Sequence, residues 1–314
     1  MSDDTDTPPI TVPTPQRAGD WKAILRDLGV TPSRRMGQNF LVDRDVLAGI
    51  VAAAGVRPGE TVIEVGPGLG ILTAALAEAV GGAGRVVAVE LDKRLAEYLQ
   101  TAYAATPQVT ILQHDILRTT PGDLVGAVPY AVVANLPYQI TSAAFRHFLE
   151  TAHPPERMTL LVQREVAQRI VATPPEMSIL AIAVQFFAAP RIVLDVPPEA
   201  FVPRPQVQSV ILNLDVAVPP LPPERWRGFF SLVQAGFGAK RKQIHNSLVE
   251  RLRLPRETVG AFLDAAGIDA MRRAQTLSLD EWLALERAAI SLDLSLSGAM
   301  GRRVGARDDD ADRA

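Results

Sequence analysis

Residues 61–70 read TVIEVGPGLG, a short apolar run that ends in three closely spaced glycines. The run has the length and composition of a buried β-strand, and the alanine- and leucine-rich residues 71–80 that follow are typical of a helix. Glycines at a strand-to-helix turn let the backbone turn sharply and approach a ligand beside the helix N-terminus. The spacing is GxGxG, whereas dinucleotide-binding proteins use GxGxxG, which weakens an NAD interpretation without eliminating it.

The alternation of strand and helix continues beyond this turn. We predict further strands at 85–90, 109–113, 130–135 and 158–163, with helices at 92–103 and 142–150. Strands with little polar alternation, separated by helices, indicate a parallel sheet covered on both faces. We therefore predict a doubly wound α/β domain. Two apolar runs that lie closer together, 191–196 and 208–216, predict a late antiparallel pair at one edge.

Proline-rich and polar segments divide the chain. Residues 1–19 hold four prolines and three early aspartates, which predicts a disordered tail, and we expect the same of 293–314. Residues 217–223 are rich in proline and predict a linker between an α/β domain over 20–216 and a small all-helical domain over 224–292. Within that last region, helical spacing of apolar residues recurs at 224–236, 241–252, 256–266 and 279–291.

The composition excludes several classes of protein. Of the 314 residues 47% are hydrophobic and 21% charged, as in ordinary globular proteins, and the formal net charge is -3. The chain has no cysteine, which excludes disulfides, thiolate zinc sites and a cysteine nucleophile; its four scattered histidines give no metal-binding pattern. No apolar run approaches the ~20 residues of a membrane span, and the acidic N-terminus is not a secretory signal. We expect a soluble cytoplasmic protein without a membrane partner.

Two acidic residues follow the glycine turn at informative distances. Glu90 ends the second predicted strand, 20 residues after Gly70. A carboxylate there can accept hydrogen bonds from both hydroxyls of a ribose, so the pair favours an adenosine-containing cofactor. Asp115 follows the third strand, where it can accept from an adenine amine or cap a helix N-terminus, and both roles can hold together.

Asn135, Leu136, Pro137 and Tyr138 directly follow the fourth predicted strand. This tetrapeptide suits methylation of an exocyclic amine, whose lone pair is delocalised into the ring and is poorly nucleophilic. The Asn135 side-chain oxygen and the Leu136 carbonyl, held extended by Pro137, can accept the two amine protons and free the lone pair. Tyr138 offers a face on which an extruded base can stack. Asn and Pro are also common in turns, and the position beside the glycine turn favours the catalytic interpretation.

A basic segment stands out against the acidic remainder of the chain. Residues 225–256 contain eight Lys or Arg and a single acid, Glu250. Such a contrast indicates a directional phosphate-binding face, although a solvated helical surface has the same composition. The cationic residues are Arg225, Arg227, Lys240, Arg241, Lys242, Arg251, Arg253 and Arg256.

Nine segments in order complete the pattern: MGQNFL (36–41), VIEVGPGLGILT (62–73), VVAVELD (86–92), HDIL (114–117), NLPYQITS (135–142), LVQREVAQRI (161–170), FVPRPQVQS (201–209), FGAKRKQIHNSL (237–248) and RAQTLSLDEW (273–282). With them the chain resembles the small-subunit rRNA adenine N6,N6-dimethyltransferases, the KsgA/RsmA family, over about residues 20–290. The departures are small: Arg34-Arg35-Met36 stands where a basic residue, serine and leucine are common, and Lys240 stands where arginine is common.

The resemblance implies a class I S-adenosylmethionine-dependent methyltransferase fold, with a mainly parallel seven-stranded sheet and a small helical C-terminal domain. It implies S-adenosylmethionine as methyl donor and two adjacent adenosines near the 3′ end of 16S rRNA, within the small ribosomal subunit, as acceptor. It also implies that Asn39 and Leu41 bind the cofactor and that the loop carrying Arg204 lies near the target base. Together with the residues argued above, the predicted cofactor residues are Asn39, Leu41, Gly66, Gly68, Glu90, Asp115 and Asn135, and the predicted RNA-binding residues are Arg204, Lys240, Arg241 and Lys242.

Three other functions share parts of this pattern. The related 23S rRNA adenine methyltransferases share the cofactor turn, but Tyr138, the FVPRPQVQS segment and the helical tail favour the small-subunit enzyme. A nucleic-acid-binding factor that has lost catalysis is disfavoured by the intact glycine turn, Glu90 and NLPY. An NAD-dependent oxidoreductase is disfavoured by the loop spacing. We expect a monomeric enzyme.

Overall fold

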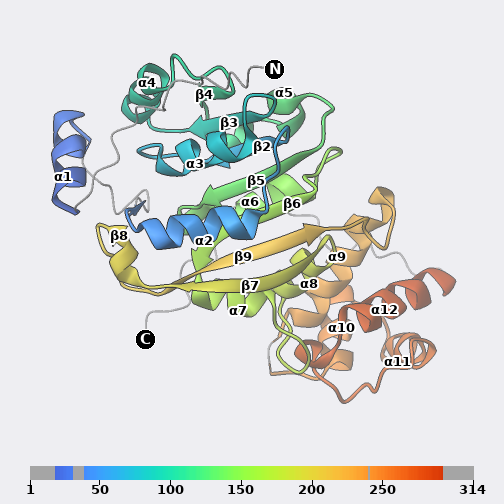
Figure 1. Cartoon of the computed structure of the whole chain (residues 1–314). Helices are drawn as coiled ribbons and strands as arrows, with labels where there is room; N and C mark the ends of the chain where they lie inside the picture. Colours follow the sequence, from blue (N-terminus) through green and yellow to red (C-terminus); the bar gives the residue numbers. More distant parts are fainter. Residues whose placement is uncertain (1–17, 31–38, 240, 293–314) are drawn as a thin grey trace. The chain divides into compact units, whose positions relative to one another are not determined.

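The computed structural model of the protein describes residues 18–30, 39–239 and 241–292, without the side chains of residues 18–22 and of Tyr138. The described residues form two compact units (Figure 1). The first comprises the described residues of Met1–Val171 together with Phe187–Val218. The second comprises Ala172–Phe186 and the described residues from Pro219 on.

A seven-stranded sheet forms the centre of the first unit, in the order β4-β3-β2-β5-β6-β9-β7. The first five of these strands are mutually parallel, and β9 pairs antiparallel with both β6 and β7. The predicted fold class and the predicted antiparallel edge pair are therefore confirmed. The strands are β2 (Thr61–Val65), β3 (Arg85–Glu90), β4 (Val109–Gln113), β5 (Tyr130–Asn135), β6 (Arg157–Gln163), β7 (Ala188–Val196) and β9 (Ser209–Val216).

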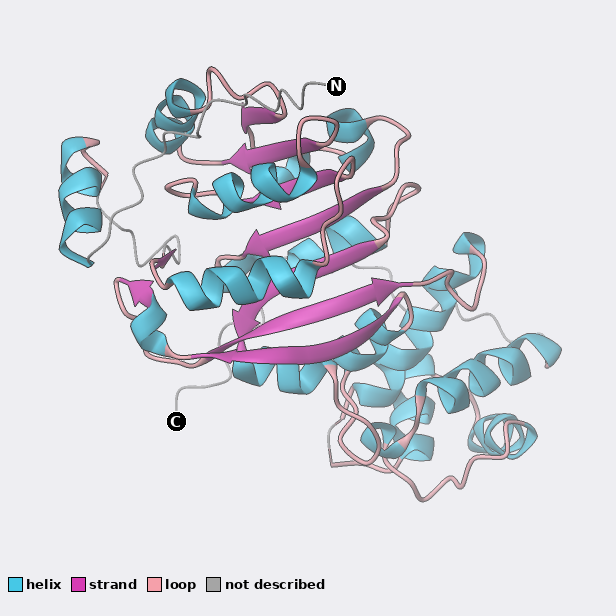
Figure 2. Ribbon diagram, viewed as in Figure 1, coloured by secondary structure: helices cyan, strands magenta, loops and turns pink. Residues whose placement is uncertain are grey.

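Helices cover both faces of this sheet (Figure 2). The central strands are buried almost throughout, as expected of parallel strands between two helical layers. The helices of the first unit are α1 (Ala18–Asp27), α2 (Arg44–Ala54), α3 (Ile71–Val80), α4 (Lys93–Ala102), α5 (Pro121–Val125), α6 (Thr141–Leu149) and α7 (Arg164–Ile170). The carboxylate of Asp43 caps α2 by accepting from the backbone N–H groups of Asp45 and Val46.

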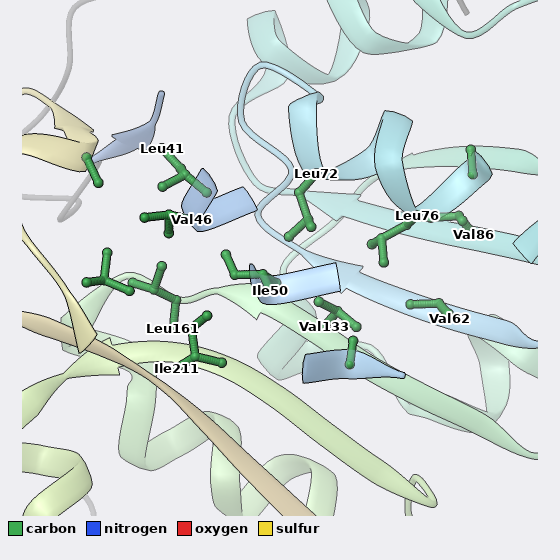
Figure 3. Close-up of a cluster of buried hydrophobic side chains, with 14 of the residues drawn as sticks. Leu41, Val46, Ile50, Val62, Leu72, Leu76, Val86, Val133, Leu161 and Ile211 are labelled. Atoms are coloured by element: carbon green, nitrogen blue, oxygen red, sulfur yellow. The ribbon is translucent and has the colours of Figure 1, made fainter. Parts of the chain in front are cut away.

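The core on one face lies where α2 and α3 pack onto the sheet (Figure 3). Ile50 of α2 and Leu76 of α3 meet Val62, Val133 and neighbouring strand residues there, all with at most 1% of their surface exposed. This apolar layer fixes β2 against α3 and so sets the position of the turn that joins them.

A second sheet has two short strands that are far apart in the sequence. β1 (Phe40–Leu41) pairs antiparallel with β8 (Phe201–Val202), which follows β7. Leu41 and Phe201 both belong to the buried cluster beneath α2. The pairing therefore brings together the segments that carry MGQNFL and FVPRPQVQS, although about 160 residues separate them in the chain.

The second unit is helical. It contains α8 (Ile179–Gln185), α9 (Pro223–Phe237), α10 (Ile244–Leu252), α11 (Arg256–Ala265) and α12 (Leu279–Ser291). The four predicted C-terminal helices are present with small shifts of their ends. α12 begins with a capping box, in which Ser278 and Glu281 exchange side-chain-to-backbone hydrogen bonds.

The predicted domain boundary needs a correction, because Ala172–Phe186 belongs with the helical unit and not with the sheet. The ring of Phe186 stacks on Phe229 at a centroid distance of 4.9 Å and meets Phe230 edge-on at 5.1 Å. Burial of these aromatic surfaces joins α8 to α9 across the intervening sequence. The second unit is therefore assembled from two separate stretches of chain, whereas we predicted one continuous stretch starting after the proline-rich linker.

The predicted N-terminal tail also extends slightly too far, since α1 begins at Ala18, within the last turn of what we assigned to the tail. The predicted disorder of residues 1–17 and 293–314 concerns residues outside the described part. In the described ranges no helix is both long and apolar enough to cross a membrane.

A largely buried ion pair inside the helical unit gives a stability prediction. Glu286 of α12 is 2% exposed and accepts from Arg225 of α9, with Nε 2.8 Å from Oε1. Arg225→Ala leaves this carboxylate without its partner. We expect the unfolding free energy to fall by about 2 kcal/mol, less than the ~3–5 kcal/mol of a fully buried pair, because the Arg225 side chain is one-third exposed.

Denaturant unfolding followed by circular dichroism measures this change. Arg227→Ala, on the exposed side of the same helix, is the matched control and should change stability by less than about 0.5 kcal/mol. Equal stabilities of the two variants would contradict a structural role for the Arg225–Glu286 pair.

Candidate active site

A cavity of about 310 Å³ lies at the carboxyl ends of β2, β3 and β5. Parallel α/β sheets bind their ligands at this edge, because the strand-to-helix turns there converge on one place. The cavity brings together nine of the residues predicted from sequence to form the site. They are Asn39, Leu41, Gly66, Gly68, Glu90, Asp115, Asn135, Leu136 and Pro137.

The glycine turn follows β2 and needs glycine for two different reasons. Gly66, Gly68 and Gly70 all have positive φ, between 59° and 83°, which side chains rarely adopt. A Cβ on Gly70 would lie 2.6 Å from Leu99 Cδ2, so packing against α4 excludes a larger residue there. Gly66 and Gly68 line the cavity, whereas Gly70 is not among its lining residues.

Glu90 ends β3 beside this turn and is 6% exposed. Its Oε2 accepts from the backbone N–H of Gly68 at 3.1 Å, and Oε1 accepts from that of Asp92 at 2.9 Å. Burial raises the pKa of Glu90, while these backbone hydrogen bonds oppose the shift. Glu90 therefore holds the glycine turn in place, a role that the sequence did not reveal, and keeps lone pairs for donors in the cavity.

Asp115 lies on the same wall and caps a short 3-10 helix, Ile116–Arg118. Its Oδ1 accepts from the backbone N–H of Leu117 at 3.0 Å, and its Oδ2 lies 3.5 Å from Arg118 Nε in an exposed ion pair. The two interpretations of Asp115 are thus geometrically compatible, because the capping carboxylate also lines the cavity.

Asn135 is the last residue of β5, and its amide is held by the N-terminal segment. Asn135 Nδ2 donates to the backbone carbonyl of Asn39 at 3.1 Å. Because this bond occupies the amide nitrogen, it assigns Oδ1 as the atom that can accept from a substrate amine. Leu136 behind it is 1% exposed, and the 3-10 helix Tyr138–Ile140 follows Pro137. The stacking role predicted for Tyr138 concerns a side chain outside the described part.

Phe40 places the N-terminal segment over the glycine turn. A Cβ on Gly68 would lie 3.1 Å from Phe40 Cδ1, which shows how closely the ring covers that backbone. Residues 36–38 of the MGQNFL segment lie outside the described ranges. Asn39 and Leu41 line the cavity, and their binding of the cofactor stays a prediction.

Glu64 is a cavity residue that the sequence analysis overlooked. It lies within β2, is 1% exposed, and its Oε2 lacks a hydrogen-bond partner among the described residues. Burial raises the pKa of Glu64 to about 8; the nearby Glu90 also raises it, and the Thr73 hydroxyl lowers it. The available signal was a charged residue inside an otherwise apolar strand directly before the glycines.

The residues predicted to contact RNA lie elsewhere. Arg204 follows β8 and pairs with Glu199, with Nη2 2.5 Å from Oε1 and both side chains exposed. Arg241 and Lys242 belong to the helical unit, and Lys240 lies outside the described residues.

A family model and two similar proteins relate this chain to ribosomal RNA methyltransferases. The model of the ribosomal RNA adenine dimethylase family matches residues 31–290. A protein of Dehalococcoides mccartyi named ribosomal RNA small subunit methyltransferase A is 42% identical over 281 residues, which cover 88% of this chain and 95% of that one. A protein of the same name from Alkaliphilus metalliredigens is 38% identical and covers 85% and 94%.

Solved structures agree with the fold. The 23S rRNA methyltransferase ErmE superposes with a TM-score of 0.65 at 31% identity, over 80% of this chain and 99% of that one. A dimethyladenosine transferase from Plasmodium falciparum gives a TM-score of 0.69 at 22% identity, over 81% and 98%, a likeness of fold. With a family model that matches most of its length and relatives near 40% identity, this chain belongs to the ribosomal RNA adenine dimethylase family.

Proposed function

We propose that this protein, an S-adenosylmethionine-dependent rRNA adenine dimethyltransferase, methylates the N6 amines of two adjacent adenosines near the 3′ end of the small-subunit rRNA. The observation that carries the proposal is the position of Asn135. Asn135 lines the same cavity as Glu90 and Asp115, and its amide nitrogen donates to the Asn39 carbonyl, which leaves the amide oxygen as the acceptor of this side chain. An acceptor aimed at an amine is thereby combined with the groups that recognise an adenosine.

The residues of the cavity fit the cofactor. Glu90 and Asp115 offer acceptors for ribose hydroxyls and an adenine amine, and the glycine turn brings bare backbone to the cavity wall at Gly66. Glu64 adds a buried carboxyl oxygen with no partner among the described groups. Bound there, S-adenosylmethionine supplies an electrophilic methyl group on a sulfonium.

Catalysis by this chain is then mostly positioning. Asn135 Oδ1 and the Leu136 carbonyl accept hydrogen bonds from the two protons of the target amine, which frees its lone pair. Pro137 fixes the backbone that carries these acceptors, with φ of -54° and ψ of 129°. The methylated ammonium is acidic enough to lose its proton to water, so that no dedicated general base is required.

The small-subunit target is supported by the two relatives named ribosomal RNA small subunit methyltransferase A. Labelled methyl transfer to undermethylated small subunits, compared with large-subunit RNA and followed by nucleoside analysis, tests it. We expect N6,N6-dimethyladenosine in the small-subunit RNA alone. Transfer to large-subunit RNA alone would contradict the proposal and favour the reaction named for ErmE. Light scattering after gel filtration tests whether the enzyme is the monomer we expect, and its cytoplasmic location stays a prediction.

We further propose that the helical unit docks the RNA. Several of the cations in residues 225–256 are already engaged by other groups of the chain and are less available to phosphates. Arg225 is engaged by Glu286, Lys242 Nζ lies 2.6 Å from Glu250 Oε2, and Arg251 donates to the carbonyl of Gly238 at 2.9 Å. Arg256 is exposed but donates to Asn246 Oδ1 at 3.0 Å. Arg227, Arg241 and Arg253 are exposed and have neither an ion pair nor a side-chain hydrogen bond to any described residue. These three are the best placed of the described cations of the segment to contact phosphates.

Reversal of these three charges, Arg227→Glu, Arg241→Glu and Arg253→Glu together, should weaken RNA binding and flatten its salt dependence. Each lost phosphate contact reduces the slope of log K against log salt by roughly 0.7–0.9, so that the slope should fall by about 2. A salt titration of binding to small-subunit particles measures it. Arg85→Glu, an exposed residue at the amino end of β3, is the matched control. If the triple variant and the wild type have the same slope of log K against log salt, the basic segment is only a solvated surface and does not contact RNA.

A further inference from the structure

Glu64 is a buried carboxyl group on the wall of the cofactor cavity to which the proposed reaction gives no task. It lies on β2 two residues before Gly66, is 1% exposed, and has Oε2 without a partner among the described groups. A carboxylate in such a place loses the hydration that stabilises its charge, so that it stays neutral unless a cation approaches.

The neighbours of Glu64 supply no such cation. Thr73 of α3 offers a hydroxyl, Glu90 of β3 is a second carboxyl group, and Tyr103 of α4 is a phenol whose hydroxyl donates to the Gly70 carbonyl at 2.6 Å. The remaining titratable groups on the described cavity wall are His114 and Asp115. Three carboxyl groups and no Lys or Arg line the described cavity, which therefore suits a ligand that brings its own positive charge.

Burial raises the pKa of Glu64 to about 8, so that the group carries a proton at neutral pH in the ligand-free protein. A nearby positive charge has the opposite effect, because it stabilises the carboxylate. Entry of a cationic ligand therefore lowers the pKa of Glu64, so that the carboxyl group loses its proton at neutral pH.

We propose that Glu64 exchanges a proton for the cofactor's positive charge. When a cationic ligand enters, the O–H bond of the Glu64 carboxyl breaks, the proton passes to solvent, and the carboxylate pairs with the ligand. The inference rests on the proposed function for the identity of the ligand. S-Adenosylmethionine carries two cations, its sulfonium and its α-ammonium, whereas S-adenosylhomocysteine keeps only the ammonium.

Calorimetry at pH 7 in two buffers of different ionisation enthalpy counts the protons released. With S-adenosylmethionine we expect the wild type to release about 0.9 proton per site, the protonated fraction of a group whose pKa is near 8. Glu64→Gln should release almost none. Glu78→Gln, an exposed carboxylate on α3, is the matched control and should behave as the wild type. The ligand's own amine contributes equally to the wild type and to Glu78→Gln, and adenosine, which carries no cation, should release no proton.

Affinity gives a second readout. Wild-type affinity for S-adenosylmethionine should rise close to tenfold from pH 6 to pH 7, as the release of one proton requires, and the Glu64→Gln profile should be flat. S-Adenosylhomocysteine, measured in the same way, identifies the cation that pairs with Glu64. Proton release with both S-adenosylmethionine and S-adenosylhomocysteine identifies the α-ammonium, and release with S-adenosylmethionine alone identifies the sulfonium. Either result supports the proposal.

Equal proton counts for the wild type and Glu64→Gln would overturn the inference while leaving the function intact. A wild type that does not bind S-adenosylmethionine would overturn the proposed function instead. Should Glu64→Gln fail to fold, infrared difference spectra of the wild type decide the question. Loss of a protonated-carboxyl band on addition of S-adenosylmethionine supports the exchange, and its persistence in the bound protein refutes it.

Discussion

Asn135→Ala is expected to lower the rate of methyl transfer by at least about a hundredfold, while S-adenosylmethionine still binds. The loss follows from the chemistry of the amine, whose lone pair is released only when both of its protons are accepted. Removal of one preorganised polar group at a reacting centre costs about 10²–10³ in rate. Single-turnover transfer to small-subunit particles measures the rate, and calorimetry measures cofactor binding. Near-normal turnover would contradict a catalytic role for Asn135.

The hydrogen bond from Asn135 Nδ2 to the Asn39 carbonyl provides a finer test of the same residue. Asn135→Asp keeps an acceptor oxygen but loses this donor. We expect Asn135→Asp to retain more activity than Asn135→Ala, because acceptance from the target amine is the essential part. The reverse order would show that attachment to Asn39, and not acceptance from substrate, is what Asn135 provides.

Glu90→Ala should weaken the binding of S-adenosylmethionine by about 30- to 200-fold, or roughly 2–3 kcal/mol, the scale of lost hydrogen bonds to a charged acceptor. Two causes add. The ribose loses its acceptor, and the backbone N–H groups of Gly68 and Asp92 lose theirs, which releases the glycine turn. Titration calorimetry measures the affinity, and Glu97→Ala on the exposed face of α4 is the matched control.

Glu90→Gln distinguishes the two causes. A residue that only accepts from ribose hydroxyls would keep part of its function as glutamine. Because both oxygens of Glu90 already accept from backbone N–H groups, glutamine places its own NH₂ against one of those donors. We therefore expect Glu90→Gln to bind the cofactor nearly as weakly as Glu90→Ala. Affinity close to that of the wild type would mean that the support of the glycine turn is dispensable.

Local sequence pattern was sufficient for most of the sheet. Apolar runs bounded by glycine or polar residues gave β2, β3, β4 and β5 at their observed ends. α8 was missed because residues 179–189 are apolar except for Gln185 and carry no helical period. Its assignment to the helical unit depends on the contact of Phe186 with Phe229, which only the folded chain creates.

Some residues of the candidate site could be predicted from the sequence, and others could not. Glu90, Asp115 and Asn135 could be predicted to share a cavity, because each ends or follows a strand and parallel strands end at one edge of the sheet. The hydrogen bond from Asn135 to Asn39 joins positions 96 residues apart and leaves no local trace. Glu64 was overlooked because TVIEV was interpreted only through its apolar pattern, which predicts burial, and the one charged residue within it was not considered as a ligand contact.

The interleaving of Ala172–Phe186 with the later helices has a consequence for the order of events during synthesis. This segment leaves the ribosome before β7 and β9 do, yet its packing partner α9 begins only at Pro223. Its apolar side chains, including Phe186, must therefore wait while the last two strands of the sheet are made. Domains fold largely as units during translation, with the N-terminal one first. The sheet can therefore be completed while Ala172–Phe186 still lacks its packing partner α9, and apolar surface stays exposed on the nascent chain until α9 has emerged.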